Sequence, residues 1–175
     1  EKMYNEEDEP KFGLYNKESS TYSKSKHAYE LGSDYGLILR VRMPFCDKLH
    51  ERSYLTKIKK YNNLINLVNS KTYIPQLVLF MNNIISDGRE TKEKDIINFV
   101  QPDALSTDGV TDLMKKYKLG NPDWDWVQFE ELNCRANRSN CVLDTLKLST
   151  KYSFYPVSEE VAIRGALNKI IKDEE

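Results

Sequence analysis

Residues 21–44 read TYSKSKHAYELGSDYGLILRVRMP, and this stretch decides the fold class of the chain. The run Ser19-Ser20-Thr21 can start a helix, which we expect to continue to about Ser33. The branched, apolar run from Gly36 to Met43 then predicts a buried strand, and Pro44 ends it. A helix followed directly by a buried strand is typical of α/β proteins, in which the two kinds of element alternate.

The predicted helix carries a tyrosine and a lysine at helical spacing. Tyr22 and Lys26 are four residues apart, and positions i and i+4 lie on one face of a helix. A lysine ammonium beside a phenol favours the phenolate, so the two side chains can act as a proton-transfer pair. The same spacing also arises on an ordinary solvated helix face, and the pair alone does not distinguish the two.

Helices and strands continue to alternate along the rest of the chain. Apolar residues at helical spacing predict five further helices, which cover Arg52–Leu64, Ile74–Ile85, Thr107–Tyr117, Leu143–Leu148 and Ser158–Lys172. A second buried strand is expected from Asp95 to Val100, and residues 1–20 are expected to be irregular. We therefore predict an α/β fold that forms a single unit over residues 1–175, without an internal repeat.

Two tryptophans, Trp124 and Trp126, lie in a predicted loop from Asn121 to Trp126. Indole rings on a loop can stack on a uracil or a sugar, or they can pack against the core. We favour packing for both.

Composition and charge exclude several classes of partner. The 26 basic and 27 acidic side chains nearly cancel, so no net field favours nucleic acid or an anionic membrane. We expect no transmembrane helix, because no 18-residue apolar run occurs. The acidic N-terminal stretch has no signal-peptide core, which favours a cytoplasmic location.

The cysteines and histidines give no metal-binding pattern. Cys46, Cys134 and Cys141 contain no CxxC pair, and free thiols in a reducing compartment are the simplest interpretation. His27 and His50 have no partner at metal-ligand spacing, so no metal site is expected.

Six segments in order resemble one enzyme family, the nucleotide-rhamnose synthase 3,5-epimerase/4-reductases. The segments are Tyr22–Lys26, Leu39–Pro44 (LRVRMP), Tyr54–Ile58 (YLTKI), Val68–Thr72 (VNSKT), Ile97–Pro102 (INFVQP) and Arg138–Asn140 followed by Leu143-Asp144. These enzymes are extended short-chain dehydrogenase/reductases, and the chain is more distantly similar to the dTDP-4-dehydrorhamnose reductases. The resemblance covers about Asp8 to Ile171 and implies the C-terminal part of a Rossmann-type fold.

The glycine-rich strand-turn-helix with which members of this family begin is not found in the sequence. The chain has seven glycines and no G-x-G-x-x-G arrangement, the pattern that holds a cofactor pyrophosphate at a helix N-terminus. The resemblance therefore implies the end of a Rossmann-type sheet with the Tyr/Lys helix, followed over about residues 60–175 by a sugar-nucleotide-binding region. The N-terminal nucleotide-binding half would be absent, and an upstream Rossmann half or a second copy in a homodimer would be a partner.

The resemblance also implies roles for individual catalytic residues. Tyr22 would donate a proton to the C4 oxygen of the sugar, and Lys26 would hold the nicotinamide ribose of NADPH (or NADH). Met43 and Pro44 would line the cofactor, although they could equally just end a strand. Lys57 would stabilise the enolate formed during epimerisation, with an exposed helix lysine as the alternative.

A second group of residues is implied to bind the nucleotide-sugar substrate. Asn69, Ser70 and Thr72 lie in a polar turn that the family uses near the substrate, and a simple helix-entry turn is the alternative. Arg138 matches a diphosphate, because a guanidinium binds phosphate through two parallel hydrogen bonds, and an exposed loop arginine is the alternative.

The function that these implications describe is an NADPH-dependent epimerase/reductase. It would convert a UDP- or dTDP-4-keto-6-deoxyglucose to the L-rhamnose nucleotide, and the chain in isolation is expected to be inactive. The alternative is a non-catalytic sugar-nucleotide-binding or structural module that has lost its cofactor half.

Overall fold

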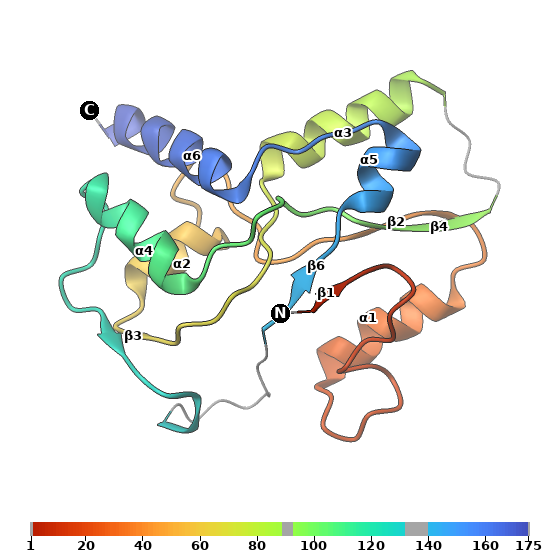
Figure 1. Cartoon of the computed structure of the whole chain (residues 1–175), viewed down its shortest axis with the longest axis horizontal. Helices are drawn as coiled ribbons and strands as arrows, with labels where there is room; N and C mark the ends of the chain where they lie inside the picture. The colour runs from red at the N-terminus through yellow and green to blue at the C-terminus, as the bar shows by residue number, and fades with distance from the viewer. Residues whose placement is uncertain (1, 89–92, 132–139, 175) are drawn as a thin grey trace.

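The computed structural model describes residues 2–88, 93–131 and 140–174 of the chain, and Figure 1 shows the arrangement of its elements. The helices are α1 (Thr21–Gly32), α2 (Tyr54–Lys60), α3 (Ile74–Ser86), α4 (Thr107–Lys116), α5 (Leu146–Tyr152) and α6 (Glu159–Glu174), with a short 3₁₀ helix, η1, at Phe129–Glu131. The strands are β1 (Met3–Tyr4), β2 (Gly36–Arg40), β3 (Asn63–Leu64), β4 (Lys94–Asn98), β5 (Asp125–Trp126) and β6 (Val142–Leu143).

Four of the predicted helices are confirmed to within two residues at each end, namely α1, α3, α4 and α6. Their ends have local causes. The Ser20 hydroxyl accepts a hydrogen bond from the Ser23 amide at 3.1 Å and caps α1, and the Ser106 hydroxyl accepts one from the Gly109 amide at 3.1 Å and caps α4. Pro75 occupies the first turn of α3, where its missing N–H costs no hydrogen bond.

Two predicted helices are wrong in part. The helix expected over 52–64 is α2 alone, since Tyr61 is extended and the Asn62 carbonyl accepts the Asp125 amide at 2.7 Å. The following residues form β3, which pairs in parallel with β5 inside the predicted tryptophan loop. The helix expected over 143–148 starts only at Leu146, because Val142 and Leu143 pair with Met3 and Tyr4.

Strands β2 and β4 form a parallel pair, with Gly36 opposite Lys94 and Arg40 opposite Asn98. The crossover between them contains α2, β3 and α3. In Figure 1, α3 and α5 lie on one side of this pair and α1 lies on the other. The α/β prediction is thus confirmed. The strand expected over 36–43 ends at Arg40, because the Arg42 amide and carbonyl bond Thr72 rather than β4, and Met43 then takes a left-handed conformation with φ of 37°.

The buried side chains form two separate clusters. The larger lies among α2, α4 and α6 and contains Phe45, Leu55, Ile58, Leu64, Tyr73, Val110, Leu113, Met114, Leu119, Ala162, Ile163, Ala166, Leu167 and Ile170. The smaller joins α3, β4 and α5 and contains Phe80, Ile97, Phe99 and Leu148. Phe80 contacts the rings of Phe99, Tyr152 and Phe154, with centroids 5.2–5.5 Å apart.

Several elements near the β2–β4 pair keep apolar surface exposed. Helix α1, which is described along its whole length, has no buried residue, and β2 is only half-buried at every position. Phe80 is the buried residue of α3, while its large side chains Val78, Leu79, Met81 and Ile85 are exposed. Several large apolar side chains exposed on one helix are typical of a surface that contacts another body.

No helix in the described ranges has the length and apolar character needed to cross a bilayer.

Candidate functional site

The predicted Tyr/Lys pair lies at the start of α1 and is open to solvent. The Lys26 Nζ atom lies 5.4 Å from the centroid of the Tyr22 ring, and Tyr22 is 72% exposed. The pair is close because the cap at Ser20 begins the helix immediately before it, and helical spacing then brings positions 22 and 26 together.

The loop before α1 is held against the helix by a histidine. The Nδ1 atom of His27 accepts a hydrogen bond from the Leu14 amide at 2.8 Å. A side chain at Gly13 would place its Cβ 2.7 Å from this nitrogen, so only glycine allows the contact. His27 therefore has a structural role at the base of the loop.

The first turn of α1 lies toward the carboxyl end of β2. Only a short connection, residues 33–35, separates the helix from the strand, so the two run in opposite directions. Arg40 at the end of β2 forms an ion pair with Glu30 of α1, and its Nη1 atom donates to the Glu6 carbonyl at 3.3 Å. Ligands of open α/β sheets bind at the carboxyl ends of the parallel strands. Glu30 belongs to the last turn of α1, so the ion pair joins that turn, and not Tyr22, to Arg40. The first turn, with Tyr22, lies toward this edge because α1 and β2 run in opposite directions (Figure 1).

Met43 and Pro44 connect this edge to α2. Met43 has the positive φ noted above, and the Pro44 carbonyl accepts the Tyr54 amide at 2.8 Å, which fixes the start of α2. Lys57 lies on α2 with its side chain exposed, while Leu55 and Ile58 of the same helix are buried. Figure 1 shows α1 and α2 on different sides of the molecule, so Lys57 is not brought beside Tyr22.

Asn69, Ser70 and Thr72 are buried, and each has a hydrogen-bond partner within the protein. The Asn69 Oδ1 atom accepts from Arg42 Nη2 at 2.7 Å, and the Ser70 hydroxyl accepts from the Leu143 amide at 2.9 Å. The Thr72 hydroxyl donates to the Phe99 carbonyl at 2.7 Å and accepts from the Arg42 amide at 3.1 Å. These contacts tie together the chain segments that follow β2 and β4. Their role in substrate binding stays a prediction, and Arg138 lies outside the described residues, as does Cys134.

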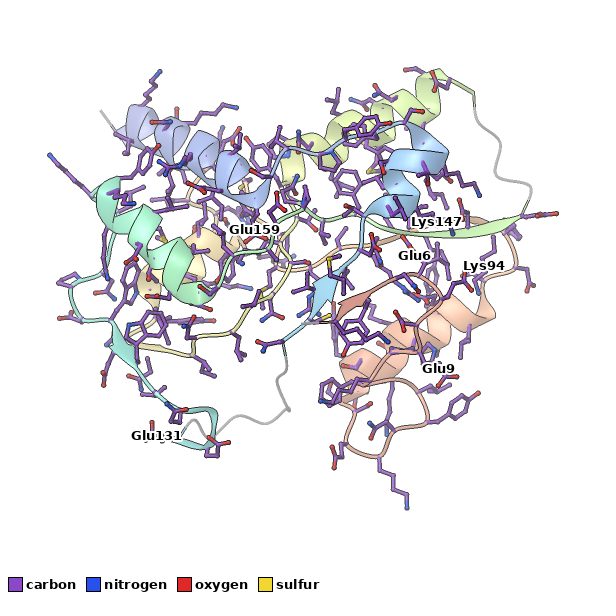
Figure 2. All side chains as sticks on the ribbon, viewed as in Figure 1. Glu6, Glu9, Lys94, Glu131, Lys147 and Glu159 are labelled. Carbon is purple, nitrogen blue, oxygen red and sulfur yellow. The ribbon has the colours of Figure 1, made fainter. Side chains whose placement is uncertain are left out.

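A buried ion pair between Lys71 and Glu159 lies beside this segment, and no sequence pattern predicts it. The Lys71 Nζ and Glu159 Oε1 atoms are 2.6 Å apart, and the two side chains are 1% and 0% exposed. Lys71 Nζ also donates to the carbonyls of Asn69 and Leu105, both at 2.9 Å, and the Glu159 carboxylate accepts the amides of Lys71 and Leu105. Burial lowers the pKa of Lys71 and raises that of Glu159, against the attraction of each charge for the other. Figure 2 shows Glu159 at the start of α6.

The tryptophans divide between packing and exposure. Trp124 packs on the larger cluster, and its Nε1 atom donates to the Ile58 carbonyl at 2.8 Å, so the packing prediction is confirmed for this residue. Trp126 is 41% exposed and is not a core residue. Among the described residues, no three His, Cys, Asp or Glu side chains are grouped so that they could hold a metal ion.

Comparisons with known proteins give relatives whose names describe nucleotide-rhamnose synthesis. No family model matches the sequence. The chain is 31% identical, over 96% of its length, to the Arabidopsis thaliana trifunctional UDP-glucose 4,6-dehydratase/UDP-4-keto-6-deoxy-D-glucose 3,5-epimerase/UDP-4-keto-L-rhamnose-reductase RHM3. It is 30% identical, again over 96%, to the bifunctional dTDP-4-dehydrorhamnose 3,5-epimerase/dTDP-4-dehydrorhamnose reductase of the same plant. The chain is a homologue of part of the rhamnose synthases.

The chain spans 24% of that trifunctional relative and 53% of the bifunctional one. Solved structures agree with the fold. The L780 UDP-rhamnose synthase of Acanthamoeba polyphaga mimivirus matches 91% of this chain with a TM-score of 0.72 and 24% identity, and 57% of that protein is covered. A dTDP-4-dehydrorhamnose reductase from Bacillus anthracis, solved with NADP, matches 87% of the chain with a TM-score of 0.60 and 14% identity. The prediction that the chain has part of a Rossmann-type α/β fold is confirmed.

Proposed function

We propose that this chain is the substrate-binding and proton-transferring part of an NADPH-dependent 3,5-epimerase/4-reductase. The enzyme would convert a UDP- or dTDP-4-keto-6-deoxyglucose to the corresponding L-rhamnose nucleotide. The observation that carries the proposal is the similarity of nearly the whole chain to rhamnose synthases, together with an exposed Tyr22–Lys26 pair at the carboxyl edge of the β2–β4 sheet.

In the reduction, the chain's own contribution is a proton. NADPH, when bound, supplies the hydride that reduces C4 of the sugar. Tyr22 donates its phenolic proton to the C4 oxygen, so the ketone becomes an alcohol and the tyrosine becomes a phenolate. The Lys26 ammonium lies close enough to the ring to stabilise that phenolate. The exposure of Tyr22 leaves its hydroxyl accessible to a substrate.

In the epimerisation, we assign Lys57 the stabilisation of an enolate. Removal of the proton at C3 or C5 places negative charge on the C4 oxygen, and an ammonium near that oxygen lowers the barrier. The hydrogen bond from Tyr54 to Pro44 fixes α2, which carries Lys57, to the segment that leaves β2. Since α1 and α2 lie on different sides of the molecule, the similarity of the chain to rhamnose synthases, and not the position of Lys57, supports this role.

Substrate recognition is assigned to Arg138 and to the Asn69–Thr72 turn. Arg138 would bind the diphosphate through its guanidinium. Because Asn69, Ser70 and Thr72 are buried and hydrogen-bonded, we assign them to shaping the wall of the sugar site rather than to exposed contacts.

The residues present fit one end of a dinucleotide cofactor. Tyr22 and Lys26 offer polar groups for a nicotinamide ribose, and Met43 and Pro44 lie at the strand end where the nicotinamide would pack. The glycine-rich turn that would cradle the pyrophosphate is not in the sequence. We therefore propose that a further nucleotide-binding half, upstream or on another polypeptide, completes the site. The exposed apolar face of α3 and the half-buried strand β2 support such a partner.

Reconstitution tests this proposal. The chain is fused to, or mixed with, the part of the mimivirus L780 protein that it does not match, and NADPH oxidation is followed with UDP-4-keto-6-deoxyglucose. We expect oxidation only when both parts are present. Tyr22→Phe should lower the rate by at least about 100-fold, which is the lower end of the contribution of general acid catalysis. Tyr35→Phe is the matched control, since Tyr35 is equally exposed but lies at the other end of α1. Equal rates for the two variants would refute the role of Tyr22.

The second candidate function is a non-catalytic sugar-nucleotide-binding module. The missing glycine-rich pattern favours it. Calorimetric titration with UDP, dTDP and NADPH distinguishes the two functions. A module binds UDP or dTDP and shows neither NADPH binding nor oxidation after reconstitution, whereas the enzyme shows both.

A further inference from the structure

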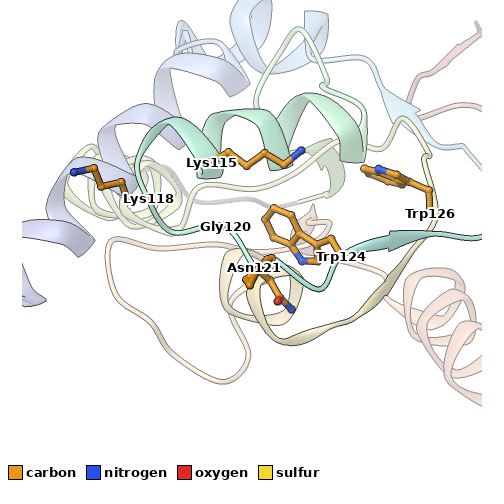
Figure 3. Close-up of a pocket in the computed structure, with 7 residues that line it drawn as sticks. Lys115, Lys118, Gly120, Asn121, Trp124 and Trp126 are labelled. Atoms are coloured by element: carbon orange, nitrogen blue, oxygen red, sulfur yellow. The ribbon is translucent and has the colours of Figure 1, made fainter.

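A pocket of about 470 Å³ lies at the C-terminal end of α4, on the side of the molecule away from α1 (Figures 1 and 3). Its lining includes Lys115, Lys118, Asn121, Trp124 and Trp126. Trp124 and Trp126 are the two tryptophans of the chain, and both line this pocket. The volume is within the range of pockets that hold small molecules, about 300–1,000 Å³.

One indole ring is fixed in place by the core. The Nε1 atom of Trp124 donates to the Ile58 carbonyl at 2.8 Å, which sets the orientation of the ring. Gly120 lets this ring and Lys115 approach the backbone. A Cβ atom at Gly120 would lie 3.5 Å from Trp124 Cζ3 and 3.1 Å from Lys115 Cγ.

The second indole is held through its backbone. Trp126 lies opposite Leu64 in the β3–β5 pair, and the Val127 amide donates to the Leu64 carbonyl at 3.0 Å. The Asn121 side chain ties the preceding turn to the Tyr61 carbonyl at 3.3 Å. The Trp124 ring and the backbone that carries Trp126 are therefore fixed by contacts that need no ligand, which reduces the entropy lost on binding.

The charge at the pocket is positive. Figure 3 shows the Lys115 side chain running along α4 with its amino end above the space between the two indole rings, while Lys118 points away. Lys115 is 3.5 Å from Asp112 in an exposed pair, which holds the ammonium only weakly. Asp125 precedes Trp126 in β5, and successive side chains of a strand point to opposite faces, so its carboxylate faces away from the indole of Trp126.

We propose that this pocket binds a mononucleotide, with the base against the indole rings and the phosphate at Lys115. A neutral sugar would use the indoles and leave the ammonium unused, and inorganic phosphate would do the reverse. A nucleotide uses both, because every base has a π-face that stacks on an aromatic side chain. The site is independent of the rhamnose synthase function proposed above, since it uses none of the residues assigned to that function.

The two indole N–H groups give a direct test. In ¹⁵N-labelled protein they produce two indole signals in a ¹⁵N–¹H correlation spectrum, and both belong to the pocket. We expect AMP and UMP to shift these signals saturably, with AMP binding more tightly because its ring is larger. Inorganic phosphate, which lacks the base, should bind at least about fivefold more weakly than UMP, the lower end of what one stacked base contributes. Uridine, which keeps the base but lacks the phosphate, should also bind more weakly than UMP.

Paired variants separate the pocket from the protein surface at large. Lys115→Gln and Trp126→Ala should each weaken AMP binding by about fivefold or more, the latter being followed through the remaining Trp124 signal. Lys116→Gln is the matched control, because Lys116 is the exposed neighbour on the same helix and does not line the pocket. Thermal unfolding by circular dichroism confirms that each variant is folded. The proposal is overturned if AMP gives no saturable shift, if phosphate alone binds as tightly as UMP, or if Lys116→Gln has the same effect as Lys115→Gln.

Discussion

Removing Glu159 should destabilise the protein more than any exposed acidic residue does. In a Glu159→Ala variant, Lys71 Nζ keeps the Asn69 and Leu105 carbonyls but loses its counter-charge in a fully buried position. The amides of Lys71 and Leu105 lose their acceptor as well. Breaking a buried ion pair on one side costs about 3–5 kcal/mol, and each orphaned donor costs about 1–3 kcal/mol of desolvation. These costs overlap, so we expect a loss of about 4 kcal/mol.

A loss of that size is a large part of the stability of a domain, which is about 5–15 kcal/mol. Equilibrium urea unfolding measures it, provided that the slope of the transition is unchanged. Glu160→Ala is the matched control. Glu160 is the next residue, it is exposed, and it pairs with Arg164 at 2.7 Å, so its removal should change stability by less than about 0.5 kcal/mol.

A double substitution of Lys71 and Glu159 tests whether the two charges are coupled. Lys71→Met combined with Glu159→Leu removes both charges, and apolar pairs of similar volume often replace buried ion pairs at little cost. The double variant should therefore be more stable than the sum of the two single losses predicts, by at least about 1 kcal/mol. Additive losses, or a Glu159→Ala loss below about 1 kcal/mol, would show that the pair is not buried and coupled as described.

Two further predictions concern Asp95 and Ser106. Burial alone would raise the pKa of Asp95, but hydrogen bonds from Lys147, Tyr152 and Lys151 lower it to about 2. A carboxylate with a lowered folded-state pKa stabilises the protein above about pH 4, and this effect is lost as the pH falls toward 2. The free energy of unfolding should therefore fall by about 1–2 kcal/mol in this window. Asp95→Asn should make the urea stability depend less on pH there. Ser106→Ala removes the acceptor for the Gly109 amide at the start of α4 and should lower the stability measured by thermal unfolding by about 1 kcal/mol. Ser158→Ala is the control and should cost less, because the Ser158 hydroxyl is 3.4 Å from the Val161 amide.

The sequence predicts those parts of the fold that depend on neighbouring residues. Serine caps and a proline in the first turn set the starts of α1, α3 and α4, and these signals lie within three residues of the helix ends that they define. Helical spacing likewise predicts that Lys26 lies against Tyr22. Such local features can be predicted from the sequence because they do not depend on residues far away along the chain.

The missed features all depend on distant partners. Strand β1 pairs with β6 and β3 pairs with β5, and each strand has only two residues, too few for an alternating pattern. Lys71 and Glu159 are 88 positions apart, and in the sequence each resembles an ordinary polar residue of a turn or a first helical turn. The exposure of Trp126 follows from its place in strand β5. The sequence predicts a loop there and not a strand.

The helix that carries Tyr22 has consequences for motion as well as for chemistry. Because no residue of the described helix α1 is buried, its attachment depends mainly on partly buried polar contacts such as the Arg40–Glu30 pair and the His27–Leu14 hydrogen bond. Backbone amides in such an element exchange with solvent through local openings of low free energy, long before α4 and α6 open with the core. Any body that covers α1 would suppress those openings. Tyr22, the proposed proton donor, would then become rigid only on assembly, and the activity of the assembled enzyme would depend on the order of this helix.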